Sequence, residues 1–507
     1  MCGIISRMEF KNICIVLLIF YTNVKGQKNP HYRDDRSTMV HLFEWKFDDI
    51  ADECERFLGP KGYGGVQVSP VSENLIIPGR PWYERYQPIS MKIASRSGNE
   101  ESFKQMVQRC NKADVRIYVD VVINHMTGDA NPAVGVDGSI AKTDERLYPA
   151  VPFTFHDFHR VCAINNYRNA TEVRNCELSG LHDLDQSKEH VRNMIVDFLN
   201  RLIDMGVAGF RIDAAKHMWP EDLKVIYSRM NNLSIAHGFP PNARPFIYQE
   251  VIDLGGEAVS KKEYTSFARV IEFTFGIVLG NIFRGNEDLK YLKNWGNGWG
   301  LLKSDDALVM IDNHDNQRGH GAGGASILTY KVPKQYKMAV VFELAHPYGL
   351  PRVMSSYYFD DPSIGPPAYS NGTIISPEIN SEGVCTNGWV CEHRWRQIYQ
   401  MVIFRSVAKN SPLQNWWDND DDQIAFSRGD LGFVAINGDD TDLRQVLHTG
   451  LPAGKYCDVI SGEIINGNCT GKIIEVDKNR MALIEIPADS EDGCLAIHIG
   501  RTSLVNF

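Results

Sequence analysis

The sequence has no excess of positive charge and no apolar run long enough to cross a membrane. Its 507 residues include 53 Lys and Arg against 63 Asp and Glu, a formal net charge of −10. Proteins that follow a phosphate backbone usually carry a basic surface, so this balance argues against nucleic-acid binding. The most apolar run, residues 13–21, is far shorter than the roughly 20 residues that span a bilayer.

The chain also lacks internal repeats and phosphate-binding fingerprints. The glycine-rich run at residues 319–324 has no Lys-Ser or Lys-Thr ending, which disfavours a phosphate-cradling loop. A content of 43% hydrophobic and 23% charged residues is typical of a globular protein and excludes wholesale disorder. We therefore expect a soluble protein without nucleic-acid or membrane partners, and nothing in the sequence indicates a state beyond a monomer.

Residues 1–26 have the pattern of a secretory signal. Arg7 and Lys11 precede the short apolar run, and polar residues follow Gly26. The sequence therefore predicts removal of residues 1–26 and a secreted, extracellular protein in an oxidising compartment, where disulfides persist. A buried N-terminal helix or strand is the alternative interpretation.

The cysteines support the same compartment, although their number is odd. Of 11, Cys2 and Cys14 lie in the predicted signal. Cys54 and Cys110 lie on the apolar faces of two predicted helices, 48–58 and 100–112, and two such helices packed on one sheet would bring the thiols together. Cys494 is then left as a buried free thiol or an intermolecular one. Spacing, which never fixes connectivity by itself, suggests three local bridges, Cys162 to Cys176, Cys385 to Cys391 and Cys457 to Cys469.

Strand-like and helical patterns alternate along the first four fifths of the chain. The clearest helical pattern covers residues 191–203, and strand, helix, strand alternation predicts parallel pairing. Eight such units predict a (β/α)8 TIM barrel, with first part 27–123 and second part 185–411. The eight apolar, β-branched runs are residues 39–43, 65–68, 116–123, 209–212, 245–248, 270–273, 307–311 and 352–354.

Two regions interrupt this alternation. Residues 124–184, after the third predicted strand, are rich in Asn, Asp, Gly and Pro and hold one cysteine pair, which indicates an irregular inserted subdomain. From residue 412 to 507 the helical signal fades and short strand-like runs alternate with Gly, Asn and Asp. This pattern predicts a separate C-terminal antiparallel β-sandwich domain.

Carboxylates stand at the ends of several predicted strands, where a charge is costly unless it is paired or functional. The carboxyl ends of barrel strands meet at one rim, so Asp213, Glu250 and Asp315 are predicted to cluster, with Arg211 nearby. Crowded carboxylates push their pKa values apart, which leaves one acid as a proton donor and another as a nucleophile. Cleavage of a glycosidic bond requires this division, while a structural ion-pair cluster or a metal cage is the alternative.

Four strand-end segments resemble motifs of animal α-amylases, in the α-amylase family of glycoside hydrolases. They read DVVINH (120–125), GFRIDAAKH (209–217), YQEVID (248–253) and DNHDNQRG (312–319). The resemblance extends from about residue 41 to 499 and includes HLFEW (41–45), WYERYQP (82–88) and WVCEHRWR (389–396). It implies a catalytic barrel, a calcium-stabilised insertion and a C-terminal β-sandwich, acting on α-glucan polysaccharides.

The resemblance also implies residue roles in endo-hydrolysis of α-1,4-glucosidic bonds in starch and glycogen. Asp213 is the implied nucleophile, Glu250 the general acid and then base, and Asp315 the carboxylate that binds sugar hydroxyls and steadies the transition state, with retention of configuration. Tyr83 stands where the family usually has a second Trp, so an altered affinity is expected at that subsite. The residues implied to bind substrate are Trp82, Tyr83, Tyr86, Gln87, Asp120, His125, Lys216, His217, His314 and His320, the last in a loop expected to move over the substrate.

Two ions are implied by the same likeness. Calcium maps to the side chains of Asn124 and Asp183 and the carbonyls of Arg174 and His217, with ordinary loop polarity as the alternative. Chloride maps to Arg211, Asn313 and Arg352, where it would temper the charge of Arg211; a salt bridge from Arg211 to a carboxylate is the alternative. Two other function classes remain open, an exo-acting or transglycosylating α-glucosidase relative and a catalytically silent carbohydrate-binding or scaffold protein.

Overall fold

The computed structural model describes residues 27–33 and 36–504, so the predicted signal, residues 1–26, lies outside the described residues. Eight parallel strands close into a barrel, in which the first strand pairs with the last (Met39 with Arg352). Burial on both faces explains why these strands read as continuous apolar runs, and each of the eight predicted runs overlaps one of them. The strands are β1 (Met39–Leu42), β2 (Gly65–Val68), β6 (Arg116–Val121), β9 (Gly209–Ile212), β10 (Phe246–Gln249), β11 (Arg269–Ile271), β12 (Ala307–Val309) and β13 (Leu350–Ser355).

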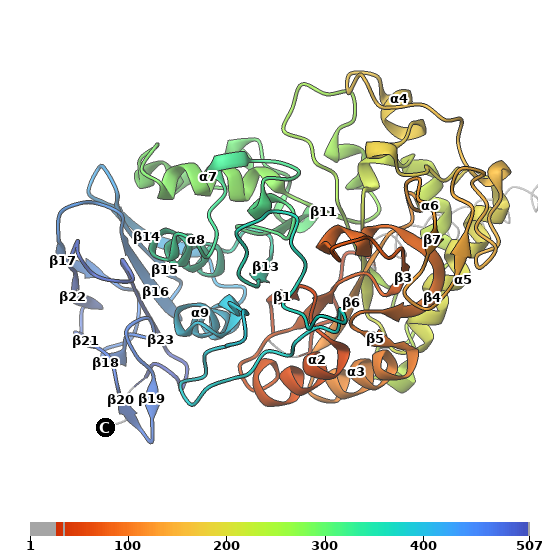
Figure 1. Ribbon diagram of the computed structural model, residues 1–507. Coiled ribbons are helices and arrows are strands. Elements are labelled where there is room, and N and C mark those ends of the chain that lie inside the picture. Colours follow the sequence, from red (N-terminus) through yellow and green to blue (C-terminus); the bar gives the residue numbers. More distant parts are fainter. Residues whose placement is uncertain (1–26, 34–35, 505–507) are drawn as a thin grey trace, which may run out of the picture.

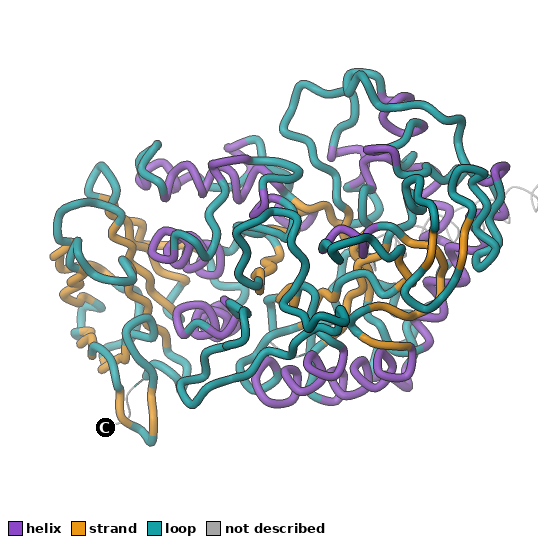
Figure 2. Tube along the Cα trace, viewed as in Figure 1, coloured by secondary structure: helices purple, strands orange, loops and turns teal. Residues whose placement is uncertain are grey.

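Helices cover the outside of the barrel, as Figures 1 and 2 show. The predicted helix at 191–203 is confirmed as part of α5, whose buried face includes Val191, Ile195 and Leu202. An Asn99 capping box opens α3, which packs beside α2. The helices are α2 (Phe47–Glu53) with a π-helical turn η1 (Cys54–Leu58), α3 (Glu100–Lys112), α5 (Glu189–Asp204), α6 (Pro220–Arg229), α7 (Phe273–Phe283), α8 (Pro333–Ala345) and α9 (Arg396–Val407).

A small antiparallel sheet, which the sequence patterns did not predict, lies between β2 and α3. It consists of β3 (Ser72–Asn74), β4 (Pro88–Ser95) and β5 (Gly98–Asn99). The loop from β3 to β4 carries a five-residue 3-10 helix, η2 (Trp82–Tyr86). The sheet therefore supports the segment that holds three of the predicted sugar-binding aromatics.

An irregular insertion connects β6 to β9, as the sequence predicted. Its regular elements are a two-stranded sheet of β7 (Ala133–Val134) and β8 (Ile140–Ala141) and the short helix α4 (Ala170–Asn175). A bridge between His125 and Asp183 joins the two ends of the insertion, shortly after β6. The limits of this predicted domain, 124–184, stay a prediction.

Antiparallel sheets form the C-terminal part of the chain, which confirms its predicted class. Phe433, Leu447 and Ile484 belong to a second hydrophobic core between the sheets. The main sheet has the order β14 (Leu413–Asp418), β15 (Gln423–Arg428), β16 (Gly432–Asn437), β23 (Cys494–His498). The two-stranded sheets pair β17 (Leu443–His448) with β22 (Met481–Ile486), β18 (Gly454–Cys457) with β21 (Ile473–Val476), and β19 (Ile464–Ile465) with β20 (Asn468–Cys469).

All four predicted disulfides are present. Cys54 is bonded to Cys110 between the neighbouring helical segments, and the three local bridges have the predicted partners. Cys494 is a buried free thiol. Within the described residues, no helix has both the length and the apolar composition to cross a membrane.

Candidate active site

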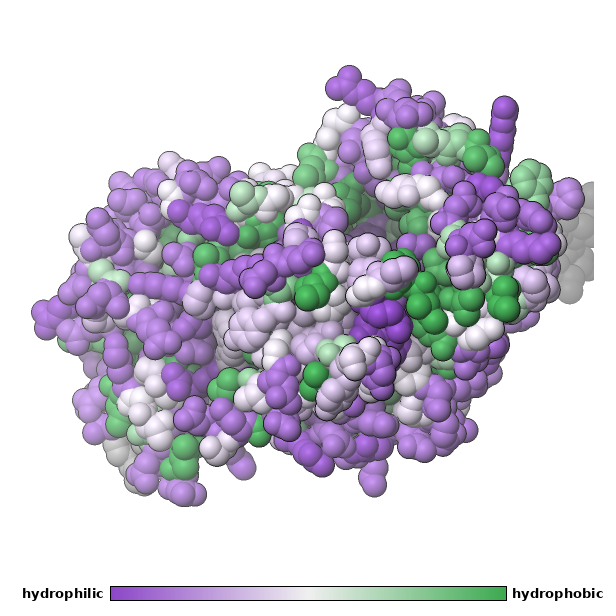
Figure 3. Space-filling model, in the orientation of Figure 1, coloured by the Kyte–Doolittle hydropathy of each residue, from purple (hydrophilic) through white to green (hydrophobic). Residues whose placement is uncertain are grey.

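A cavity of about 620 Å³ opens at the carboxyl ends of the barrel strands. Its lining includes all three predicted acids, Asp213, Glu250 and Asp315. Residues of the insertion form part of its wall, so the cavity lies between the insertion and the barrel. The face of the molecule in Figure 3 is mostly hydrophilic, with patches of hydrophobic residues.

Arg211, on β9, connects the acids. Its Nη1 donates to Asp120 Oδ1 at 2.6 Å and to Asp213 Oδ1 at 2.8 Å, and its Nη2 lies 2.8 Å from Glu250 Oε1. Arg211 is fully buried, and the carboxylates around it raise its pKa well above the ordinary value despite burial, which opposes the charge. One guanidinium thus holds carboxylates from three neighbouring strands in charged contact.

Glu250 follows β10 and is fixed by the turn that follows β9. Its Oε2 accepts a hydrogen bond from the Ala214 backbone N–H at 2.8 Å, and its own N–H donates to Ile212 O at 3.0 Å. Ala214 has φ 48°, a left-handed conformation that is unfavourable for a residue with a side chain. The turn therefore presents the backbone of Ala214 to Glu250 directly beside Asp213.

Asp315 lies in the turn after β12. Asn313 Oδ1 accepts hydrogen bonds from the Asp315 and Asn316 backbone N–H groups, at 3.1 and 2.7 Å, which shape this turn. His314 Nε2 lies 3.2 Å from Asp315 Oδ2. The His314 ring stacks on Tyr86 at 5.0 Å, and burial lowers its pKa well below the ordinary value, so it is neutral.

Burial and crowding change the acidity of the cluster. Burial raises the pKa of Asp213 well above its ordinary range, and Glu250 and Asp120 add to the rise, while Arg211 opposes it. Burial, with the negative charge of Glu250, raises the pKa of Asp315 to about 7. The acids therefore titrate as a group, and near neutral pH part of the cluster holds a proton.

The predicted substrate residues fall into two layers. Two of them lie behind the cavity: Asp120 accepts from Arg211 and from the Tyr86 hydroxyl at 3.0 Å, and His314 contacts Asp315. Burial lowers the pKa of His125 and of His217 to about 4, so both are neutral hydrogen-bonding groups. The residues that line the cavity are Trp82, Tyr83, Tyr86, Gln87, His125, Lys216, His217 and His320.

The sequence analysis missed several lining residues. Lys216 forms an ion pair with Glu257, donates to Ile252 O at 2.7 Å, and has its Nζ 5.0 Å from the Tyr167 ring centroid. Glu257, Ile252 and Tyr167 line the cavity, with Leu178, Ser179, Leu181 and Gly321. They belong to segments without regular periodicity. Ile252 lies within the motif at 248–253, Glu257 follows that motif, and Gly321 lies in the glycine-rich run at 319–324.

One carboxamide oxygen and one carboxylate oxygen are suited to binding a cation. Asn124 Oδ1 and Asp183 Oδ1 are buried without a hydrogen-bond partner, and Leu184 N–H donates to Asn124 O at 3.0 Å beside them. The other predicted calcium ligands lie at the same boundary, because His217 Nδ1 donates to Val173 O, next to Arg174, at 2.8 Å. Oxygen donors of this kind suit Ca²⁺.

The predicted chloride residues include unpartnered donors. Arg211 Nε and Asn313 Nδ2 are buried without a hydrogen-bond acceptor, and these donors fit an anion. Arg352 instead donates to Gln67 Oε1 at 2.6 Å and to Met310 S at 2.7 Å. The salt bridge that the sequence analysis gave as the alternative is also present, since Arg211 pairs directly with the carboxylates of Asp120 and Asp213.

Two families match most of the chain. Residues 86–349 match the alpha amylase catalytic domain, and residues 414–500 match the alpha amylase C-terminal all-beta domain. The chain is 58% identical over 474 residues to an alpha-amylase of Tenebrio molitor, covering 93% of this chain and 99% of that protein. It is 56% identical over 492 residues to an alpha-amylase-related protein of Drosophila atripex, covering 97% and 99%.

A solved structure shows the same architecture. A mutant of alpha-amylase I from Eisenia fetida, crystallised with maltohexaose, superposes with a TM-score of 0.89 at 46% identity and covers 93% of this chain and 98% of that one. The wild-type form of that protein gives the same TM-score.

Proposed function

The chain belongs to the α-amylase family of glycoside hydrolases, and from that membership we propose how its residues divide the hydrolysis of internal α-1,4-glucosidic bonds in starch and glycogen. The observation that carries the proposal is the contact of one guanidinium, Arg211, with Asp213 and Glu250 in a cavity that Asp315 also lines. Two carboxylates held this close are compatible with a retaining mechanism, which needs a separation of about 5–5.5 Å.

The reaction proceeds by double displacement. Asp213 attacks the anomeric carbon while Glu250 protonates the glycosidic oxygen, so the C–O bond breaks and a glycosyl-enzyme ester forms. Glu250, now ionised, takes a proton from water, whose oxygen attacks the same carbon and releases Asp213. Asp315 binds sugar hydroxyls and steadies the positive charge that develops on the ring.

Sugar rings bind along the lining side chains. Trp82, Tyr83 and Tyr86 offer apolar faces with polar edges, the combination that suits a glucose ring. Lys216 and the neutral imidazoles of His125 and His217 supply hydrogen bonds. The smaller ring of Tyr83 lowers affinity at its subsite relative to family members with a Trp there.

Two ions complete the site in this proposal. The unpartnered oxygens of Asn124 and Asp183, with the carbonyls of Arg174 and His217, would hold Ca²⁺, which would tie the insertion to the barrel. Arg211 and Asn313, with unpartnered donors, and Arg352 would hold Cl⁻, whose charge would offset that of Arg211 beside the acids. The residues of this chain keep their roles in substrate binding and proton transfer as given above.

The proposal includes secretion and a three-part organisation. Four disulfides support an extracellular location, since such bonds persist in oxidising compartments. The proposed parts are the barrel (27–123 and 185–411), the insertion (124–184) and the C-terminal domain (412–507).

Loss of starch–iodine colour, followed together with the sizes of the products, tests the proposal. The wild type is expected to remove the colour while short products are still scarce, and Asp213→Asn to lose at least about 10³-fold in kcat because the nucleophile is gone. Asp204→Asn, an exposed position at the end of α5, is the matched control and keeps full activity.

Three outcomes would contradict the proposal. Equal activity of Asp213→Asn and the wild type removes the nucleophile assignment. Early maltose with slow colour loss identifies an exo-acting relative. A wild type that binds starch without cutting it identifies a carbohydrate-binding protein.

A further inference from the structure

The 3-10 helix η2 presents its two sides to different surroundings. Trp82, Tyr83 and Tyr86 line the cavity, and we call these three residues the aromatic platform. Glu84 and Arg85, between them in sequence, point away from the cavity and are 1% exposed. A helix of five residues is not stable by itself, so contacts behind it must fix the orientation of the platform.

Glu84 binds the segment that precedes the helix in sequence. Arg80 Nε lies 3.0 and 2.8 Å from the two Glu84 carboxylate oxygens, and Arg80 Nη2 donates to Oε1 at 2.8 Å. The Ile77 backbone N–H also donates to Glu84 Oε2, at 3.3 Å. A paired arginine and carboxylate with several parallel contacts defines an orientation as well as a distance.

Arg96 connects this ion pair to the loop that follows β13. Its Nη1 lies 3.9 Å from Glu84 Oε1 and donates to Arg80 O at 3.3 Å, while its Nε donates to Gly372 O at 2.9 Å. The same loop holds the platform from the front, because the Trp82 indole N–H donates to Pro362 O at 2.9 Å. Arg80, Glu84 and Arg96 together are the Glu84 clasp.

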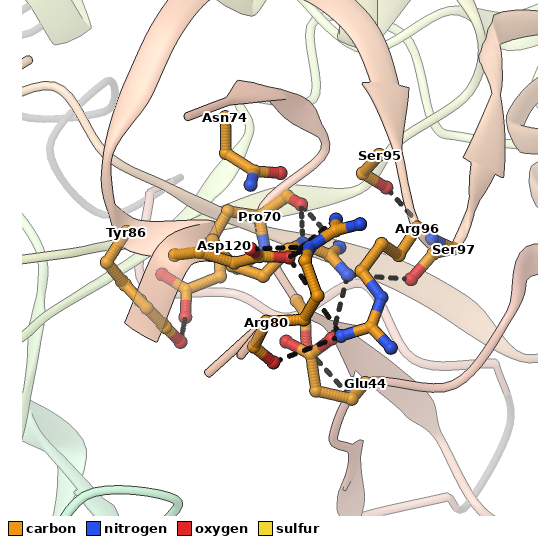
Figure 4. Close-up of polar contacts among 12 residues, drawn as sticks. Glu44, Pro70, Asn74, Arg80, Tyr86, Ser95, Arg96, Ser97 and Asp120 are labelled. Atoms are coloured by element: carbon orange, nitrogen blue, oxygen red, sulfur yellow. Dashed lines mark hydrogen bonds and ion pairs between the residues drawn. The ribbon is translucent and has the colours of Figure 1, made fainter. Parts of the chain in front are cut away.

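Arg85 anchors the other side of the helix. Its Nη1 donates to Glu44 Oε2 and to Ser97 Oγ, both at 3.0 Å, and its Nε donates to Pro70 O at 3.0 Å. Figure 4 shows Glu44, Pro70, Arg80, Arg96 and Ser97 gathered beside Tyr86 and Asp120. The helix is thus tied to the ends of β1, β2 and β4 as well as to the later loop.

We propose that the Glu84 clasp is a set of positioning residues that holds the aromatic platform in the orientation required for stacking on glucose units, and that it thereby sets the preference for long α-glucan chains. This inference rests on the proposed function. Buried charges are costly and replaceable by apolar groups where only stability is needed, so a network of three arginines and two glutamates directly behind the platform points to a geometric role. No clasp residue lines the cavity, so none touches the substrate.

The test compares kcat/KM for maltoheptaose with kcat/KM for maltotriose, since the longer chain can contact more of the lining side chains. In Glu84→Gln the ratio is expected to fall about tenfold, mainly through KM for maltoheptaose, which corresponds to the loss of one well-oriented aromatic contact. The matched control is Glu53→Gln, which breaks a buried pair with Arg394 (2.6 and 2.7 Å) away from the cavity and leaves the ratio unchanged. Both variants can lower the melting temperature because each breaks a buried ion pair, so only the ratio of the two kcat/KM values distinguishes positioning from stability.

Trp82→Ala separates this inference from the proposed function. If Trp82→Ala leaves the ratio unchanged, the sugar-binding role that the proposed function gives to Trp82 is wrong. If Trp82→Ala lowers the ratio and Glu84→Gln does not, the clasp has no positioning role.

Arg80→Lys covers the case in which Glu84→Gln does not fold. The Arg80 side chain is 26% exposed, and lysine keeps the charge but loses the parallel contacts. The ratio is then expected to fall about threefold, and an unchanged ratio overturns the inference.

Discussion

Arg211 is the residue on which the acid cluster depends. It is the cation that lowers the pKa of both Asp213 and Asp315 against the effect of burial. In the proposed mechanism Asp213 must be ionised to attack, and this guanidinium favours the ionised form of Asp213. The same side chain keeps Nε without a partner for a further anion.

Replacing Arg211 therefore has a predictable effect on the pH profile. In Arg211→Gln, loss of the positive charge raises the pKa of Asp213 further, so the acid limb of the kcat profile moves to higher pH and kcat falls by on the order of 10²-fold. The measurement is kcat between pH 4 and 9, with and without chloride. An acid limb that stays in place shows that Arg211 does not control Asp213, and a wild type indifferent to chloride removes the anion site.

Glu343 on α8 is a buried acid that the mechanism does not use. Both of its carboxylate oxygens lack hydrogen-bond partners, and burial raises its pKa to about 8. The folded protein therefore holds this proton more tightly than the unfolded chain, so ionisation costs stability as the pH rises from about 4.5 toward 8.

Glu343→Gln is accordingly expected to stabilise the protein at pH 8 and to have little effect at pH 4.5. The gain in the free energy of unfolding is at most about 1.4 kcal/mol for each pH unit in this window. Melting temperatures at the two pH values give the measurement. Glu53→Gln is the control with the opposite sign, because hydrogen bonds from His393 and Arg394 outweigh burial and lower the pKa of Glu53. A shift that does not vary with pH contradicts the prediction for Glu343.

At the scale of elements, the sequence predicts the strands with continuous apolar runs and misses the elements without such a pattern. The barrel strands are recognisable because both of their faces are buried, and Asp213, Glu250 and Asp315 are recognisable because they directly follow such strands. The sheet β3–β4–β5 has no such signal, since β3 and β5 are brief and β4 pairs with β3 in an irregular register. Tyr167 and Glu257 reach the cavity from loops whose path depends on tertiary contacts.

The insertion is the element whose attachment depends on Ca²⁺ in the proposed function. Its boundary with the barrel holds Asn124 Oδ1 and Asp183 Oδ1 without hydrogen-bond partners, so removal of the proposed ion would leave both oxygens unsatisfied and weaken the contact. A chelator is expected to lower the melting temperature and to speed proteolysis within residues 124–184, and added Ca²⁺ to reverse both. An ion present at 100 times its Kd contributes about 2.7 kcal/mol.

Limited proteolysis with mass spectrometry provides the measurement. Asp183→Asn is expected to behave as the chelated wild type, while Asp137→Asn, an exposed residue of the insertion that pairs with Lys92, responds to the chelator as the wild type does. Cleavage that proceeds at the same rate with and without chelator would show that no cation holds this boundary.

At the scale of the whole molecule, the barrel and the C-terminal sheets share one hydrophobic core. Phe342 of α8 and Phe426 of β15 contact each other with ring centroids 6.1 Å apart, and both belong to the main core cluster. Arg428 Nη1 donates to Ala345 O, at the end of α8, at 2.6 Å. The C-terminal sheets therefore cover two barrel helices, α8 and α9, which Figure 1 shows beside them. Composition alone indicated two separate regions, and this shared core is visible only once they are folded together.

The pairing of β1 with β13 has a consequence for biosynthesis. Residue 39 leaves the ribosome early and must wait for residue 352 before its hydrogen-bonded neighbour exists. Pairing across such a distance along the chain is slow, and Asp213, Glu250 and Asp315 share a mouth only after the ring of strands has closed. A nascent polypeptide therefore has no complete acid cluster until residue 352 of the 507 has been made and the barrel can close.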